Sequence, residues 1–255
     1  MAAIAAGLGV SKKIPFMSSY ATFSPGKNWE TIRTTIVYNH SNVKIAGHHS
    51  GIMTGPDGVT HQATEDIAIT RCWPDIEVIV PCDSHESKRA TIMAASIDGP
   101  VYLRFSRDKS VVMTTENTPF DKNIQTFWIT ENPQCTIFGT GHMLFYALQA
   151  AKELEAEGIN VLVANVACIK PLDSNGVLDL IEKTGCAVSV EDHQITGGLG
   201  SALAELLALK KPTPMEFIGL QNTFAESGSP KDIMEKYGMG KKAIMAAVKK
   251  VIGRK

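Results

Sequence analysis

Short apolar runs alternate with amphipathic stretches along almost the whole chain. The runs are nearly uniformly apolar, as strands are when helices cover both faces of their sheet. Between them, apolar residues recur at the three- and four-residue spacing of a helix. This β-α-β alternation predicts an α/β fold of mostly parallel sheets covered by helices. The predicted strands are 43–46, 76–80, 101–105, 135–139, 161–166, 187–190 and 216–220.

A polar segment without periodicity interrupts this alternation between Asp108 and Asn123. Such a segment is typical of a connection between two folded units. We therefore expect two domains, each with its own mostly parallel sheet, over residues 1–117 and 131–255. Residues 118–130 are the predicted linker.

Composition narrows the class of protein. The 255 residues carry 25 basic and 26 acidic side chains, a net charge of −1, which argues against a nucleic-acid-binding role. No stretch approaches the ~18 consecutive apolar residues of a transmembrane helix, so we expect no membrane association. Five cysteines form no C-x-x-C pair, which favours reduced thiols in a cytoplasmic protein.

The first ten residues are small and apolar, with no capping residue before them. They predict a helix that begins at the start of the chain and is buried around most of its circumference. Such a start suggests that the chain begins in the middle of a fold.

The segment from His48 to Gln62 holds the strongest functional signal. It gathers three histidines and Asp57 among three glycines, directly after a predicted strand. Ligands bind at strand ends in open α/β sheets, and glycines let a backbone approach a ligand closely. We therefore favour a binding site over a loop in which these side chains only satisfy their own turn. A metal site is the weaker interpretation, because the spacing of the histidines matches no helix-borne ligand pair.

A second glycine-rich turn, Gly197 to Gly200, precedes a predicted helix. A helix N-terminus can bind an anion, but a tight strand-to-helix turn is the simpler explanation. We favour the turn.

Several segments, in order, resemble the carboxyl-terminal half of a transketolase. The resemblance includes the aromatic segment Ile14–Phe23, the loop Gly47–Gln62 with the helix after it, and Arg104–Arg107. It continues through Ile169–Asp173 and Val190–Gly200 in the second half. The resemblance implies a pyrimidine-binding domain for thiamine diphosphate followed by a transketolase carboxyl-terminal domain.

The resemblance also assigns roles to individual residues. Tyr20 and Phe23 would flank the pyrimidine ring of thiamine diphosphate, and without the resemblance we would interpret them as ordinary core aromatics. His61 would lie near the amino group of the cofactor and the reacting carbonyl, as a catalytic residue together with His49. Asp57 would bind a ketose hydroxyl. His49 and Arg107 would bind the sugar phosphate, for which an arginine fork is well suited.

Two features of the family are not found in this sequence. Its essential glutamate would stand a few residues before Met1, together with the first strands of the pyrimidine-binding domain. The domain that holds the diphosphate and its Mg or Ca ion would belong to a separate amino-terminal subunit, as in split transketolases. The expected partners are that subunit, in a homodimeric or heterotetrameric assembly, and sugar phosphates.

The implied function is ketol transfer between sugar phosphates, as in the pentose phosphate pathway. One alternative is a 1-deoxyxylulose-5-phosphate synthase, or the beta subunit of a 2-oxo-acid dehydrogenase. His48–Ser50 and the ending Phe105–Arg107 resemble transketolases more closely. The other alternative is a non-catalytic partner-binding subunit, for which the missing glutamate is the argument.

Overall fold

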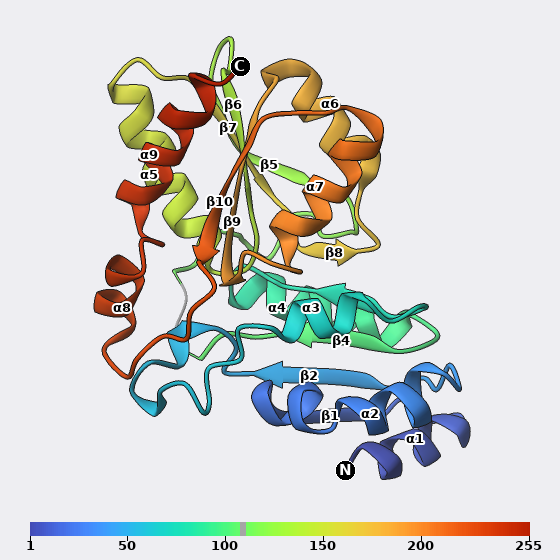
Figure 1. Ribbon diagram of the computed structural model, residues 1–255. Coiled ribbons are helices and arrows are strands. Elements are labelled where there is room, and N and C mark those ends of the chain that lie inside the picture. The colour runs from blue at the N-terminus through green and yellow to red at the C-terminus, as the bar shows by residue number, and fades with distance from the viewer. Residues whose placement is uncertain (108–110) are drawn as a thin grey trace.

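The computed structural model describes residues 1–107 and 111–255. Within them the chain forms two five-stranded sheets covered by helices (Figure 1), which confirms the predicted α/β class with two mostly parallel sheets. The start of the polar segment Asp108–Asn123, residues 108–110, lies outside the described residues.

The first sheet has the strand order β1-β2-β4-β3-β8, and its neighbours are parallel except for the antiparallel pair β3 and β8. Helices and short helical turns connect its strands. Its elements are α1 (Ala2–Val10), β1 (Phe16–Tyr20), η1 (Thr22–Lys27), α2 (Trp29–Ile32), η2 (Arg33–Val37), β2 (Lys44–His48), η3 (Ile52–Asp57), α3 (Asp66–Arg71), β3 (Glu77–Ile79), α4 (Ser84–Ser96), β4 (Val101–Arg104) and β8 (Cys168–Lys170).

The second sheet has the order β10-β9-β6-β7-β5, parallel except for the edge strand β5. In Figure 1, α5, α8 and α9 lie to one side of it, and α6 and α7 to the other. Its elements are β5 (Gln125–Ile129), β6 (Cys135–Gly139), α5 (Met143–Ala156), β7 (Val161–Asn165), α6 (Ser174–Thr184), β9 (Ala187–Gln194), α7 (Leu199–Lys210), β10 (Met215–Leu220), α8 (Pro230–Lys236) and α9 (Lys241–Ile252).

Three strands lie outside the ranges predicted from the sequence: the edge strand β1 at residues 16–20 and two further short strands. Residues 125–129, inside the predicted linker, form β5 and pair with β7, so this part of the segment is ordered sheet. Residues 168–170, from the predicted second domain, form β8 and extend the first sheet. Both are short or partly exposed, so neither has the continuous apolar pattern that identified the central strands.

The hydrophobic core runs between the two sheets. One cluster of buried side chains includes Ile45 and Tyr102 of the first sheet together with Leu162 and Ala187 of the second. The second sheet also packs its other face against α5 and α9. The two halves of the chain therefore share a hydrophobic core, and this packing fixes how the two sheets lie against each other.

The opening helix is only partly buried. Its small residues Ala2, Ala5 and Ala6 are buried, while Ile4 and Val10 are exposed. The prediction of a helix buried around most of its circumference is therefore wrong for this structure. The helix packs through its smallest side chains, which permits close approach but leaves the larger ones outside.

No helix among the described residues is long and apolar enough to cross a membrane.

Candidate functional site

Four aromatic rings predicted to belong to the site come together. The rings of Tyr20 and His49 stack with their centroids 4.1 Å apart. His61 lies edge-on to both Tyr20 and Phe23, at 5.6 and 5.4 Å between centroids. The Phe23 side chain is 40% exposed. The cluster therefore presents an open aromatic surface beside two imidazoles.

The parallel register of two strands brings these residues together. Tyr20, the last residue of β1, is opposite His48, the last residue of β2, and Ala21 N donates to His48 O over 2.8 Å. Carboxyl ends of parallel strands meet at one edge of a sheet, where ligands bind in this class of fold. The site predicted from the sequence thus lies where the topology favours one.

The backbone at His49 has an unusual conformation. Its φ is +55°, in the left-handed region that few residues other than glycine adopt. The Thr54 hydroxyl donates to His49 O over 2.6 Å and closes the turn. Backbone strain of this kind clusters at functional sites.

A third strand end contributes Arg107, which follows β4. Its Nη1 lies 2.8 Å from Asp57 Oδ1 and also donates to Thr54 O over 2.7 Å. The hydrogen bond and charge of Arg107 hold the pKa of Asp57 below its ordinary value. Two of the three predicted substrate-binding residues therefore pair with each other.

His48 has different surroundings from His49 and His61. Its ring stacks on Phe105 at 5.0 Å between centroids. Burial, followed by the neighbouring His49, lowers the pKa of His48. Across the described part of the chain, no three His, Cys, Asp or Glu side chains gather as metal ligands.

The predicted turn at Gly197–Gly200 leads into α7. The amides of Leu199 and Gly200 donate to the two carboxylate oxygens of Glu191 over 2.7 and 2.8 Å. A side chain of this chain thus occupies the helix N-terminus, where an external anion would have bound. Burial raises the pKa of Glu191 to about 7.

Sequence analysis missed a buried polar cluster beneath the site. Arg104 pairs with Asp66 over 2.8 Å, and Tyr102 OH donates to Asp66 over 2.5 Å. Burial alone would raise the pKa of Asp66, but the charge and hydrogen bonds of Arg104, together with smaller contributions from His193 and Tyr102, lower it. Arg104 Nη2 also donates to Asp192 O of the second sheet over 2.8 Å, so the cluster joins both halves of the chain.

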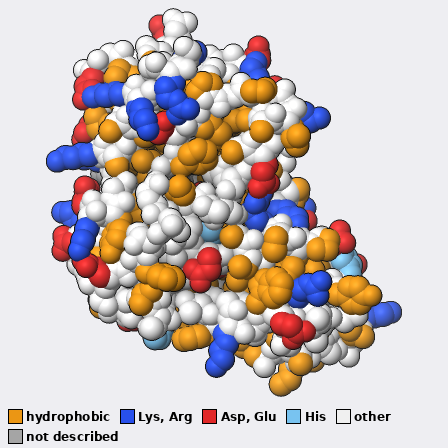
Figure 2. All heavy atoms as spheres, in the orientation of Figure 1, with side chains coloured by type: hydrophobic (Ala, Val, Ile, Leu, Met, Phe, Trp, Pro, Cys, Tyr) orange, Lys and Arg blue, Asp and Glu red, His pale blue; other side chains and the backbone are white. Residues whose placement is uncertain are grey.

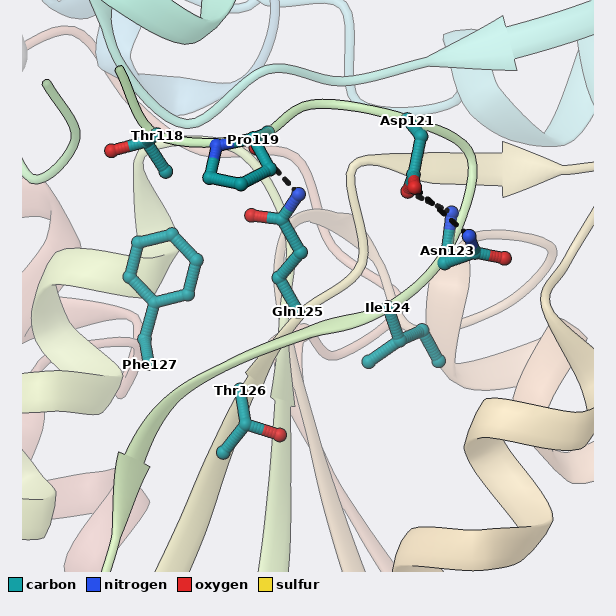
Figure 3. Close-up of a pocket in the computed structure, with 8 residues that line it drawn as sticks. All are labelled: Thr118, Pro119, Asp121, Asn123, Ile124, Gln125, Thr126 and Phe127. Carbon is teal, nitrogen blue, oxygen red and sulfur yellow. Dashed lines mark hydrogen bonds between the residues drawn. The ribbon is translucent and has the colours of Figure 1, made fainter. Parts of the chain in front are cut away.

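One cavity among the described residues lies away from the predicted site. It has a volume of about 550 Å³ and is lined by eight residues between Thr118 and Phe127, drawn in Figure 3. Gln125 donates to Pro119 O, and Asn123 donates to Asp121. Both hydrogen bonds are made within the lining of the cavity, and none of the predicted site residues lines it.

Comparison with known proteins identifies the family. Residues 1–111 match the transketolase pyrimidine binding domain, and residues 128–244 match the transketolase C-terminal domain. The chain is 36% identical over 255 residues to the 6-deoxy-6-sulfo-D-fructose transketolase subunit SqwH of a Clostridium species, spanning 100% of this chain and 79% of that protein. It is 37% identical over 249 residues to a putative transketolase C-terminal section from Methanocaldococcus jannaschii, spanning 96% and 77%.

A solved structure supports the same family assignment. The protein described as a split gene transketolase, inactive beta4 tetramer, superposes with a TM-score of 0.91 at 39% identity, over 98% of this chain and 80% of that one. Matches of this extent, in this order, also confirm the resemblance drawn from the sequence. The chain belongs to the transketolase family and comprises its pyrimidine-binding and carboxyl-terminal domains.

Proposed function

We propose that this chain is the carboxyl-terminal subunit of a split transketolase, which transfers a two-carbon ketol unit between sugar phosphates together with an amino-terminal partner subunit. The observation that carries the proposal is the convergence of three strand ends at one edge. They bring an aromatic surface, two imidazoles and the Asp57–Arg107 pair to the same place.

The aromatic surface fits the pyrimidine ring of thiamine diphosphate. Tyr20 and Phe23 lie 6.0 Å apart between ring centroids, and the exposed Phe23 offers an apolar face to a flat ring. When bound, this cofactor supplies the carbanion chemistry of ketol transfer. We place the diphosphate and its Mg or Ca ion on the amino-terminal subunit.

The two imidazoles are suited to proton transfer near neutral pH. The Thr60 hydroxyl pairs with His61 Nδ1 at 2.9 Å, so His61 would exchange protons through Nε2. His49 is held by its stacking on Tyr20. In the proposal, His61 moves a proton at the reacting carbonyl, and His49 assists while binding the phosphate end.

Arg107 and Asp57 would recognise the sugar. The guanidinium of Arg107 offers several donors to a terminal phosphate, and Asp57 accepts from a ketose hydroxyl. One relative is named for a sulfonated fructose and another, from Phocaeicola vulgatus, for apulose-4-phosphate. We propose a phosphate-ended pentose or related sugar, with a sulfonate-ended sugar as the competitor to be tested.

The proposed assembly is homodimeric or heterotetrameric, in the cytoplasm. All five cysteines are free thiols, which suits a reducing compartment.

The test is reconstitution with an amino-terminal transketolase subunit from the same genome. The chain alone should show no ketol transfer and should bind thiamine diphosphate weakly by calorimetric titration. The pair should transfer a ketol unit from a pentose phosphate donor to an aldose phosphate. Sub-micromolar cofactor affinity of the chain alone, or an inactive but correctly assembled pair, would contradict the proposal. Parallel assays with sulfonate-ended sugars would identify the preferred anion.

A further inference from the structure

Strand β9 carries three consecutive buried ionisable residues, Glu191, Asp192 and His193, and each makes different hydrogen bonds. Glu191 caps α7 within its own domain. His193 accepts from Ala68 N through Nε2 at 3.3 Å. Asp192 reaches out of the second domain: its Oδ1 accepts from Ile52 N over 2.9 Å, and its Oδ2 accepts from Met53 N over 3.3 Å. Both amides belong to η3, in the loop of residues 49–61 that we call the histidine loop.

The histidine loop passes unusually close to this carboxylate. A Cβ placed on Gly51 would lie 2.0 Å from Asp192 Oδ2, closer than any real contact. Gly51 also has a φ of +78°. The absence of a side chain at Gly51 is therefore what lets the carboxylate reach the two amides.

Asp192 is itself rigidly held. Its backbone oxygen accepts from Arg104, and its side chain lies 3.4 Å from His142 Nε2. Arg104 ends β4, three residues before Arg107. One residue of the second domain thus contacts the loop after β2 and the strand that leads to Arg107.

The histidine loop needs such an anchor. Gly51, Gly55 and Gly58 all have positive φ, and a backbone of this kind has many alternative conformations to lose on ordering. The two anchored amides lie between His49 and Asp57 in the chain. Fixing them onto a central strand restricts both flanking side chains.

We infer that Asp192 is a positioning residue for catalysis: it anchors the histidine loop through Ile52 N and Met53 N, so that the carboxyl-terminal domain orients the groups that bind sugar and move protons. This inference rests on the proposed function for its catalytic part. The anchoring itself can be measured without any substrate.

The first test compares Asp192→Asn and Asp192→Ala with Asp173→Asn in the full chain. Asp173 is a matched control, because its carboxylate also accepts from two backbone amides, Gly176 N at 2.9 Å and Ile124 N at 3.1 Å, outside the histidine loop. In the Asp192 variants, hydrogen exchange at Ile52 and Met53 should accelerate tenfold or more. Asp173→Asn should leave exchange at these amides unchanged.

With the partner subunit bound, the Asp192 variants should lose tenfold or more in kcat/KM for the ketose phosphate. Their thermal midpoint should fall no further than that of Asp173→Asn, which should keep its activity. Unchanged loop exchange in both Asp192 variants, or an equal loss of activity in Asp173→Asn, would overturn the inference.

The second test distinguishes loss of the Asp192 anchor from general destabilisation of the protein. Gly51→Ala should disturb loop exchange strongly in the wild-type background and much less in Asp192→Ala, where the clashing carboxylate is gone. Gly55→Ala is the control, because Gly55 has a φ of +66° but neighbours Pro230 and Gly228 instead of Asp192. Its effect should be the same in both backgrounds. If the effects of Gly51→Ala and Asp192→Ala on loop exchange are additive, the anchoring is overturned.

The two tests separate the possible failures. If the reconstituted wild-type pair shows no ketol transfer, the proposed function fails, while loop exchange and the Gly51 cycle still decide the anchoring. If the pair is active and Asp192→Ala keeps full kcat/KM despite a loosened loop, the positioning role is wrong and the proposed function stands.

Discussion

At the scale of single residues, the ion pair of Asp57 and Arg107 is central to the proposed recognition of the sugar. Each is proposed to bind part of the sugar, yet here the carboxylate and guanidinium lie 2.8 Å apart. A sugar phosphate must therefore share or replace this contact. The pair gives two predictions, one for each side chain.

The first prediction concerns Arg107→Ala. A hydrogen bond to a charged group contributes roughly 1.5–3 kcal/mol, so kcat/KM for phosphorylated sugars should fall about 10–100-fold. Hydroxypyruvate, which has no phosphate, should be used almost as well as before. Steady-state kinetics of the reconstituted pair with both donors measures this. An equal loss with both donors would contradict a phosphate role.

The second prediction concerns Asp57→Asn. The amide can still bond a hydroxyl but no longer neutralises Arg107, so the guanidinium should attract free phosphate more strongly. Inhibition by inorganic phosphate should strengthen several-fold. Adding Arg107→Ala to the same protein should abolish the gain. If phosphate inhibition is unchanged in Asp57→Asn, the ion pair does not compete with anions.

The sequence predicts the polar residues of this proposed site but not the residue that holds their loop in place. Asp57 and His61 stand among glycines after an apolar strand, and that local pattern is enough to indicate a site. Tyr20 and Phe23 were assigned only through a family resemblance, since aromatic residues near a strand are common in cores. Asp192 lies 140 residues from Ile52 in the chain, and no local pattern reveals such a contact.

At the scale of elements, helix α7 begins on a buried carboxylate. Glu191 accepts from the first amides of α7, yet burial raises its pKa to about 7, above the ordinary 4.5. The folded state therefore binds more protons than the unfolded state between about pH 4.5 and 7. Over this window, the contribution of Glu191 to stability decreases as the pH rises.

The third prediction follows from this decrease in stability with rising pH. In Glu191→Gln the side chain no longer titrates. The free energy of unfolding of the variant should therefore increase relative to that of the wild type as the pH rises from about 5 to 8. At ~1.4 kcal/mol per pKa unit, the relative gain should reach roughly 3 kcal/mol. Urea denaturation at several pH values measures it. Parallel pH profiles of the two proteins would show that Glu191 keeps an ordinary pKa.

The elements themselves were predicted unequally well. The sequence predicts the central strands β6 and β7 almost to the residue, because strands covered on both faces are continuously apolar. Helix α4 begins at a local cap, because the Asp83 side chain accepts from Glu86 N over 2.9 Å. The strands β1, β5 and β8 were missed because all three lie at sheet edges and lack that pattern. The partners of β5 and β8 also lie far along the chain.

At the scale of the whole molecule, the two halves are interlocked. β8 extends the first sheet from within the second half of the chain, and Arg71 of α3 pairs with Glu205 of α7 over 2.6 Å. Arg71 also donates to Gly197 O. Together with the Asp192 anchor, these contacts join the two halves, so the residues at the edge of the first sheet depend on how the two sheets are joined.

The last prediction concerns association of the full chain without its partner. Figure 2 shows hydrophobic side chains exposed in the lower part of the molecule, where Figure 1 places α1 and the N-terminus. Ile4 and Val10 are 71% and 70% exposed, and the neighbouring β1 is an edge strand of its sheet. Exposed apolar side chains beside an unpaired strand edge favour association.

We therefore expect the chain to self-associate at concentrations on the order of tens of micromolar, since association follows mass action. Ile4→Lys with Val10→Lys should shift sedimentation velocity profiles toward smaller species, because charged side chains cannot be buried there without cost. Ile92→Lys is the matched control: Ile92 is 63% exposed on α4, and its substitution should leave the profile unchanged. A wild-type chain that sediments as a monomer, or a control that dissociates the assembly equally, would show that this surface does not drive association.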